Sequence, residues 1–288
     1  MSQNERAARF AALHIQGNPL VLYNVWDAGS AKAVIEAGAA AVATSSWSIA
    51  KAQGYRDGEE IPIELAMQIV GRIAATVEAP VSVDFEGGYS DDLGELAESI
   101  SRLIDLGVVG INFEDRVVTG SGLYEIERQV DRIATIRQAA DDEGVALFIN
   151  ARTDLFLGRG DDPAASVDAA LDRASAYCFA GASGFFVPGL QEEALIARIC
   201  EDTTLPVNVM VMDGAPSSAT LAAIGVSRIS YGPIPFIETM NTLQLQAAKV
   251  HTWPISSTGS SSPTRNSPRM EARSPSGIRM APPAPDTS

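Results

Sequence analysis

Charged residues stand at the ends of apolar stretches that have the composition of buried strands. Asp84 and Glu86 end PVSVDFE, and Glu114 lies near the end of VGINFED. The stretch ALFINAR ends instead on a cation, Arg152. Successive side chains of a strand point to opposite faces, so residues two apart share a face. Ser82, Asp84 and Glu86 share one face, as do Asn112 with Glu114 and Asn150 with Arg152. The three acids and the arginine would converge if the strands are parallel neighbours.

Three carboxylates and one guanidinium leave a surplus of negative charge, which is costly to bury without a further cation. One interpretation is an ion-pair network in which Arg152 neutralises the acids. The other is a divalent metal site at Asp84, Glu86 and Glu114. These oxygen ligands suit Mg²⁺ or Mn²⁺, and no His or Cys stands at a strand end, as Zn²⁺ would favour. We favour the metal, with some carboxylates acting through water, and expect Arg152 to grip a substrate carboxylate or phosphonate.

A second set of polar residues lies outside these stretches. Ser46, Trp47 and Ser48 follow an apolar run, where hydroxyl and backbone N–H groups are suited to hold an anion. An ordinary N-cap for the segment SIAKAQ is the simpler explanation of the serines alone. Asp57, in GYRDGE, has the context of a turn residue before glycine. Asn208 lies between two valines of PVNVMV and would share a polar strand face.

Short apolar runs alternate with longer amphipathic segments from residue 20 to about 240, which is typical of repeated βα units in a parallel sheet. Eight such units fit a (β/α)8 barrel of the TIM type better than a doubly wound sheet. A barrel would gather its chemistry at the carboxyl ends of the strands. The expected strands are 20–25, 40–45, 80–86, 109–115, 146–152, 184–189, 206–211 and 227–232.

The amphipathic segments 63–77, 92–107, 125–144 and 163–181 are the clearest expected helices, and three of the four close on glycine. We expect residues 1–250 to form one catalytic barrel domain. Residues 251–288 are rich in Ser and Pro and have almost no apolar periodicity. This composition predicts a disordered tail without a catalytic role, although it is also compatible with a short interaction motif.

Composition excludes several classes of partner. Acidic residues outnumber basic residues 36 to 21, which gives a formal net charge of −15. Nucleic acid and anionic membrane surfaces are therefore not expected partners. The charged N-terminal segment lacks the apolar core of a secretory signal, and no apolar run is long enough to span a bilayer. We expect a cytoplasmic protein with a small-molecule ligand.

Taken in order, the motifs resemble the isocitrate lyase and phosphoenolpyruvate mutase superfamily. The matching text is NVWDAGSAKAVIEAGAAAVATSSWSIAKAQGYRDGE, VDFEGGYSD, GINFED, LFINARTD, GFFVPGL, LPVNVM and GVSRISYGP, over roughly residues 20–235. The resemblance implies a (β/α)8 barrel whose eighth helix is often exchanged between subunits. It also implies a homo-oligomer, usually a dimer or tetramer.

The resemblance assigns a metal to the acids. Asp84, Glu86 and Glu114 align with the family's Mg²⁺ site, which is reached partly through water. The common chemistry is cleavage or formation of a C–C or P–C bond next to a 2-oxo acid, through a metal-bound pyruvate enolate. A fixed cation gives these strand-end acids a purpose, because developing enolate charge needs stabilisation.

The same alignment suggests how the substrate is held. Ser46, Trp47 and Ser48 match the loop whose backbone and hydroxyl groups hold the carboxylate of the 2-oxo acid. Asp57 matches an acid near the metal, and Arg152 matches the substrate-binding arginine. We therefore treat Asp57 and Arg152 as the candidate catalytic residues.

The chain departs from the family pattern after the fourth expected strand. Isocitrate and methylisocitrate lyases carry a Lys-Lys/Arg-Cys-Gly-His loop there, whereas EDRVVTGSGLYEIERQ (114–129) has no Cys, His or Lys. The lysine that phosphoenolpyruvate mutases keep in this loop is also missing. Arg116 and Tyr124 are the groups of this loop that could assist binding or protonation.

Three hypotheses follow. The leading one is a Mg²⁺-dependent lyase of the phosphonomutase-like branch that cleaves a C–C or P–C bond of a small 2-oxo acid, such as an oxaloacetate-like substrate. The second is a mutase that interconverts a phosphonate and a phosphate ester, as phosphoenolpyruvate and phosphonopyruvate are interconverted. The third is a catalytically silent barrel that binds a 2-oxo acid.

Overall fold

Eight parallel strands form one sheet in the computed structural model, which describes residues 1–117, 120–158 and 162–251. Their order is β1-β8-β7-β6-β5-β4-β3-β2. The backbone just after β1 completes the ring, because Val25 N donates to Ala43 O and Ser45 N donates to Val25 O. The strands are β1 (Leu20–Leu22), β2 (Val42–Ala43), β3 (Val81–Asp84), β4 (Gly110–Glu114), β5 (Phe148–Arg152), β6 (Gly184–Phe186), β7 (Val207–Met210) and β8 (Arg228–Ser230).

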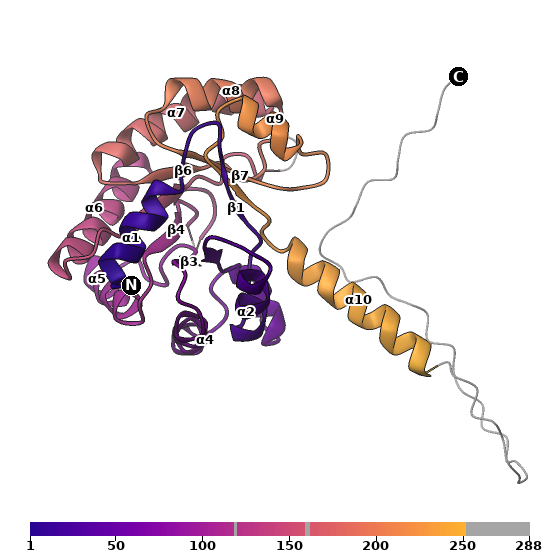
Figure 1. Cartoon of the computed structure of the whole chain (residues 1–288). Coiled ribbons are helices and arrows are strands. Elements are labelled where there is room, and N and C mark those ends of the chain that lie inside the picture. The colour runs from indigo at the N-terminus through magenta and orange to yellow at the C-terminus, as the bar shows by residue number, and fades with distance from the viewer. Residues whose placement is uncertain (118–119, 159–161, 252–288) are drawn as a thin grey trace, which may run out of the picture. The chain divides into compact units, whose positions relative to one another are not determined.

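Helices follow the strands and surround them, which makes the fold a (β/α)8 barrel as expected (Figure 1). All eight expected strands are present, and each is shorter than its apolar run. The four clearest expected helices are also confirmed. The helices are α1 (Gln3–Ala12), α2 (Ala28–Glu36), α3 (Ser46–Ala52), α4 (Ile63–Thr76), α5 (Leu93–Asp105), α6 (Ile126–Asp142), α7 (Pro163–Phe179), α8 (Glu193–Asp202), α9 (Ser218–Ala223) and α10 (Ile234–His251).

Helix α5 illustrates why these segments are helical. Asp92 caps its first turn by accepting hydrogen bonds from the backbone N–H groups of Gly94 and Glu95. Leu96, Ile100 and Leu103 recur at helical spacing and are buried. One apolar stripe therefore packs on the barrel while the opposite face carries charge.

The amino-terminal end of the barrel is closed by α1. Phe10 is fully buried and packs edge-on against Phe148 at the start of β5. Gly110, the first residue of β4, makes room for it, since a Cβ there would lie 2.7 Å from the Phe10 ring. His14 stacks on Phe148, with ring centroids 4.0 Å apart, and it also meets the Phe10 ring edge-on. This plug leaves the carboxyl ends of the strands as the end at which a polar site can open.

The polar face of the strands points into the barrel. Arg228 of β8 donates from Nη2 to Asn112 Oδ1 of β4 over 3.1 Å, and these strands are not neighbours in the sheet. The contact therefore crosses the interior. Asn150 of β5 donates to the same oxygen over 2.9 Å. The alternation of polar and apolar residues in the sequence is thus the alternation between the interior and the helix-covered face.

The chain divides into two compact units, Met1–Leu245 and Gln246–Ser288. The barrel lies within the first unit. The predicted tail, residues 251–288, falls outside the described residues except for His251, and its disorder stays a prediction. No helix among the described ranges is long and apolar enough to cross a membrane.

Candidate active site

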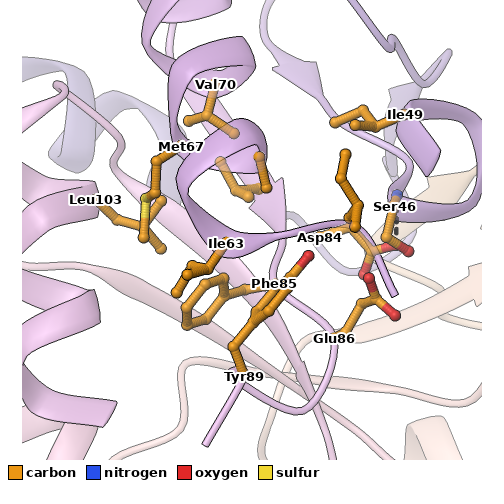
Figure 2. Close-up of a pocket in the computed structure, with 13 residues that line it drawn as sticks. Ser46, Ile49, Ile63, Met67, Val70, Asp84, Phe85, Glu86, Tyr89 and Leu103 are labelled. Atoms are coloured by element: carbon orange, nitrogen blue, oxygen red, sulfur yellow. Dashed lines mark hydrogen bonds between the residues drawn. The ribbon is translucent and has the colours of Figure 1, made fainter. Parts of the chain in front are cut away.

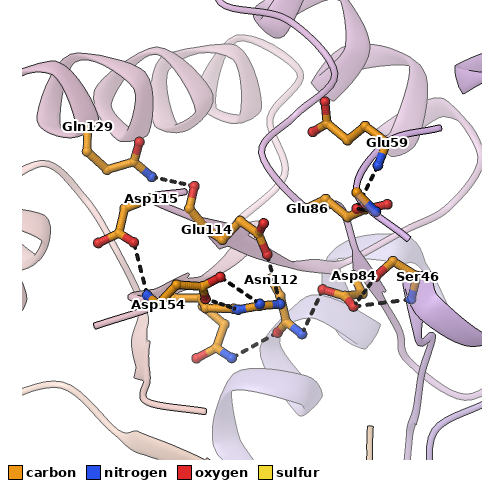
Figure 3. A network of polar contacts seen from close by, with 12 residues as sticks. Ser46, Glu59, Asp84, Glu86, Asn112, Glu114, Asp115, Gln129 and Asp154 are labelled. Atoms are coloured by element: carbon orange, nitrogen blue, oxygen red, sulfur yellow. Dashed lines mark hydrogen bonds and ion pairs between the residues drawn. The ribbon is translucent and has the colours of Figure 1, made fainter. Parts of the chain in front are cut away.

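Asp84, the last residue of β3, is the best-fixed acid at the carboxyl end of the barrel. Its Oδ2 accepts hydrogen bonds from the backbone N–H and the hydroxyl of Ser46, over 3.1 and 2.8 Å. Asn112 approaches Oδ1 from the other side with a long contact of 3.4 Å (Figure 3). The side chain is held in one orientation, and Oδ1 keeps capacity to bind a further partner.

Glu86 lies just beyond β3 in a left-handed backbone conformation with φ of 51°, which is uncommon outside glycine. Its Oε2 accepts from the backbone N–H groups of Gly58 and Glu59, over 3.0 and 2.9 Å. Its Oε1 is buried and has no hydrogen-bond partner. Burial, together with the charges of Asp57 and Asp84, raises the pKa of Glu86 to about 9. A buried acid with an unpartnered oxygen calls for an explanation, and its Oε1 could accept a ligand.

Glu114 and Arg152 end the neighbouring strands β4 and β5 and form an ion pair, with Arg152 Nη1 2.8 Å from Glu114 Oε2. Arg152 also binds Asp154, through Nε at 2.6 Å and Nη2 at 3.0 Å. Burial raises the pKa of Glu114, and the guanidinium acts in the opposite direction. The ion-pair interpretation is therefore correct for these residues, but within the described ranges no ion pair reaches Asp84 or Glu86.

An apolar wall explains part of the desolvation of these acids. A small cavity of about 20 Å³ lies between β3 and α4. Ile63, Met67 and Val70 line one side of it, and the carboxylates of Asp84 and Glu86 lie at the other (Figure 2). A cavity of this size has room for about one water molecule. The carboxylates of Asp84 and Glu86 thus have apolar side chains on one side and neighbouring acids on the other.

Asp57 lies in the loop between α3 and α4, at the exposed rim of the site. Desolvation by the surrounding protein and the charge of Asp84 raise its pKa, while Arg152 and Arg116 oppose the shift. The structure therefore brings Asp57 into the electrostatic field of the strand-end acids. Its position at the rim suits a group that meets a ligand entering from solvent.

The predicted anion loop divides between two roles. Ser46 contacts Asp84, whereas Ser48 is buried and turns to the preceding Ser45, which caps α3. Trp47 packs against Phe236 of α10, with ring centroids 6.0 Å apart. The N-cap explanation therefore accounts for the local serine pattern, and Ser46 is the member of the predicted trio that reaches the acids.

Asn208 lies inside the barrel on β7 and is almost fully buried. Its Oδ1 accepts from the Ser230 hydroxyl over 3.2 Å, while its Nδ2 has no partner. The free donor leaves a substrate-binding role open to it.

The residues fit a Mg²⁺ ion that retains water. Nowhere in the described ranges do three His, Cys, Asp or Glu side chains gather closely enough to enclose a metal. Mg²⁺ seldom needs such a cage, because it usually keeps several waters and takes one or two carboxylates. Asp84, with its open Oδ1, and Glu86, with its orphaned Oε1, provide that minimal set.

Three participants were not selected from the sequence. Asp154 is two residues beyond Arg152 in the motif ARTD, and this spacing places it on the same face. Asn112 belongs to the polar face of GINFED, and Arg228 to SRISYG. Their types and parity were visible in the sequence, but their contacts with one another depend on strands far apart in the chain.

The contacts of Arg116 and Tyr124 in the loop after β4 do not favour a role for this loop in proton transfer. Arg116 and Leu123 form an isolated antiparallel bridge that closes it. The Tyr124 hydroxyl donates to Asp91, and the Arg132 guanidinium lies 4.5 Å from the Tyr124 ring. Burial and this hydrogen bond raise the pKa of Tyr124 to about 12. Arg116 is exposed and remains the group of this loop with a charge interaction toward Asp57.

Comparison with known proteins agrees with this barrel fold. The family model described as phosphoenolpyruvate phosphomutase matches residues 10–251. An uncharacterized protein of Mycobacterium tuberculosis is 32% identical over 79% of this chain and 83% of its own length. The 2-methylisocitrate lyase of Escherichia coli is 25% identical over 84% of this chain and 82% of its own length.

A solved structure gives the same result. The crystal structure of a proposed phosphonomutase from Burkholderia cenocepacia J2315 superposes with a TM-score of 0.84 and 45% identity, over 86% of this chain and 100% of that one. Fold and site define a (β/α)8 barrel with an acidic strand-end centre. The chain belongs to the phosphoenolpyruvate phosphomutase family.

Proposed function

We propose that the protein is a Mg²⁺-dependent lyase that cleaves a C–C bond of a small 2-oxo acid related to oxaloacetate. One observation carries the proposal: the half-buried Asp84, whose Oδ1 has only a long contact of 3.4 Å, and the buried Glu86, whose Oε1 has no partner among the described residues, lie at the carboxyl end of a barrel, with the charge of Arg152 acting on Asp84. Relatives whose names describe lyases, and structural neighbours named as oxaloacetate acetylhydrolase, support this reaction class.

Each residue has a role in this proposal. Asp84 would hold the ion directly, Glu86 would reach it through its unpartnered Oε1 by way of a bound water, and Glu114 would also act through water. When bound, Mg²⁺ supplies positive charge that stabilises the negative charge developing on the 2-oxo acid. Arg152 would bind a substrate carboxylate in exchange for part of its pairing with Glu114. Asp57 at the rim would exchange a proton with the departing group, and its raised pKa, closer to neutrality than that of an ordinary aspartate, supports this role.

The test combines binding with turnover. Calorimetric titration of Mg²⁺ is expected to show binding that strengthens when oxalate, a mimic of the pyruvate enolate, is present. A panel of 2-oxo dicarboxylates is then assayed for Mg²⁺-dependent pyruvate release. The proposal fails if neither Mg²⁺ nor Mn²⁺ binds with oxalate present. Tight oxalate binding without turnover on any substrate would favour the silent barrel instead.

A phosphonomutase is the second candidate, and the 45% identity to the proposed Burkholderia phosphonomutase favours it. The same metal and anion contacts would serve it, with a phosphonate in place of the second carboxylate. Phosphorus NMR on phosphonopyruvate distinguishes the two reactions. A mutase keeps phosphorus in organic form, whereas a lyase that breaks the P–C bond releases it.

We also propose that the protein is a homodimer or homotetramer. Val21 on β1 and Tyr23 just after it are 45% and 40% exposed, and they line an open groove of about 570 Å³ with Leu13 and Val34. An apolar outer face on a barrel strand is normally covered by a helix. Leu243 of α10 is 60% exposed, which supports exchange of this helix between subunits. Sedimentation analysis of the full chain tests the assembly.

A further inference from the structure

Arg228 is a fully buried cation, and no carboxylate within the described residues forms an ion pair with it. Its Nε donates to the Ser230 hydroxyl over 3.3 Å and its Nη2 to Asn112 Oδ1 over 3.1 Å, while Nη1 has no partner. Burial lowers its pKa to about 9, which leaves it charged at neutral pH, and the charge of Asp84 opposes that shift. A core position gains no stability from a guanidinium that is satisfied this poorly. Its partners therefore indicate its role.

The amide of Asn112 is fixed by these contacts. Its Oδ1 accepts from Arg228 Nη2 and also from Asn150 Nδ2, over 2.9 Å. A flipped amide would turn its own N–H groups toward both donors, including the cation. The Asn112 Nδ2 group is consequently held toward Asp84 Oδ1, 3.4 Å away. Ser46 meanwhile holds Oδ2 of the same carboxylate.

We propose that Arg228 is a positioning residue for the metal centre, acting through Asn112 to orient the Asp84 carboxylate. The inference rests on the proposed function, because it takes Asp84 to be the direct ligand. Arg228 reaches across the barrel from β8 to β4. The orientation of the Asp84 carboxylate therefore depends on closure of the eight-stranded barrel. The positive charge of Arg228 also acts on Asp84, which has no ion-pair partner within the described residues.

The test measures metal binding without turnover. Mn²⁺ is titrated into the full chain and followed by calorimetry and by electron paramagnetic resonance. Arg228→Met is expected to weaken Mn²⁺ binding by about 10- to 100-fold, the usual cost of losing a residue that orients a ligand. The matched control is Arg137→Met. Arg137 is partly buried, whereas Arg228 is fully buried, and Arg137 donates to Leu147 O and Gly181 O, backbone carbonyls that come shortly before β5 and β6. This control is expected to lower thermal stability and leave Mn²⁺ affinity unchanged.

Two further variants decide how Arg228 acts. In an Asn112→Leu background, Arg228→Met is expected to add little further loss, because the route to Asp84 is already broken. Fully multiplicative losses would overturn the inference. Arg228→Lys keeps the charge but not the fork that reaches both Ser230 and Asn112, and it supplies the test if the Met variant does not fold. Wild-type affinity in the Lys variant would equally overturn the inference.

The outcomes separate this inference from the proposed function. Wild-type protein that binds no Mn²⁺ would defeat the proposed function. Wild-type protein that binds Mn²⁺, with Arg228→Met binding it equally well, would defeat the positioning role alone.

Discussion

Two buried carboxylates close to one another in the fold, Glu86 and Asp115, have opposite surroundings. Asp115 Oδ2 accepts from Arg173 over 3.1 Å and from the Tyr177 hydroxyl over 2.9 Å, and its Oδ1 accepts from the backbone N–H of Asp154 over 3.0 Å. Glu86 has an orphaned Oε1 and lies among other acids. Burial raises the pKa of both groups.

The difference lies in their partners and not in their burial. Asp115 has a cation and a donor for each oxygen, as a structural acid needs. Glu86 accepts two backbone N–H hydrogen bonds, both on Oε2. Its Oε1 has no partner among the described residues and is therefore open to a ligand from outside the chain. The adjacent acids Glu114 and Asp115 face different surroundings, because successive side chains of a strand face opposite ways. Glu114 pairs with Arg152 and Asp115 pairs with Arg173.

The largest expected effect is the loss of activity when Asp84, one of the proposed metal-binding acids, is removed. Asp84→Ala is expected to lower Mg²⁺-dependent pyruvate release by at least about 100-fold, because loss of a preorganised charge contact costs that much. The variant should stay folded by circular dichroism. Activity within a few fold of wild type would show that Asp84 does not belong to the ligand set.

Removing Asp115, the acid with a structural role, should lower stability and leave metal binding unchanged. Asp115→Ala is expected to lower the free energy of unfolding by about 3 to 5 kcal/mol, because it leaves Arg173 without its partner in a mostly buried position. Urea titration measures the loss. Mg²⁺ affinity in the folded variant should match wild type, and a large loss of affinity would place Asp115 among the metal-binding groups.

Metal should stabilise the protein through the acids at the barrel mouth. At 100 times its dissociation constant, Mg²⁺ is expected to raise the free energy of unfolding by about 2.7 kcal/mol, since it binds the folded state alone. Thermal melting with and without Mg²⁺ tests this. Asp84→Ala should lose the increase, whereas a variant elsewhere, such as Arg137→Met, should keep it.

The smallest expected effect is a pH dependence of the metal-free protein. The pKa of Glu86 is raised from 4.5 to about 9, so the folded state binds a proton that the unfolded state releases. Its contribution to stability is therefore complete below about pH 4.5 and is lost as pH rises toward 9. Glu86→Gln should flatten the decline between pH 7 and 9 in urea titrations. An unchanged slope would mean that Glu86 does not titrate in this range.

The contrast between Glu86 and Asp115 also shows how much of the site the sequence pattern predicts. Parity alone placed Asp84, Glu86, Glu114 and Arg152 at one end of the barrel. It could not separate Glu114, which pairs with Arg152, from Glu86, which has no cation partner in the described part of the chain. Pairing depends on side-chain reach between neighbouring strands, and composition carries no such information.

The sequence by itself determined the eight βα units, the polar interior face and the acids at the carboxyl ends of the strands. It determined them because alternation of side chains along a strand is a local property. Tertiary structure decided which acids are satisfied and which are left open. It also revealed Arg228, whose contact with Asn112 joins residues 116 positions apart. Such a contact exists only once the sheet has closed, because β4 and β8 are distant in the sequence and face each other only across the barrel interior.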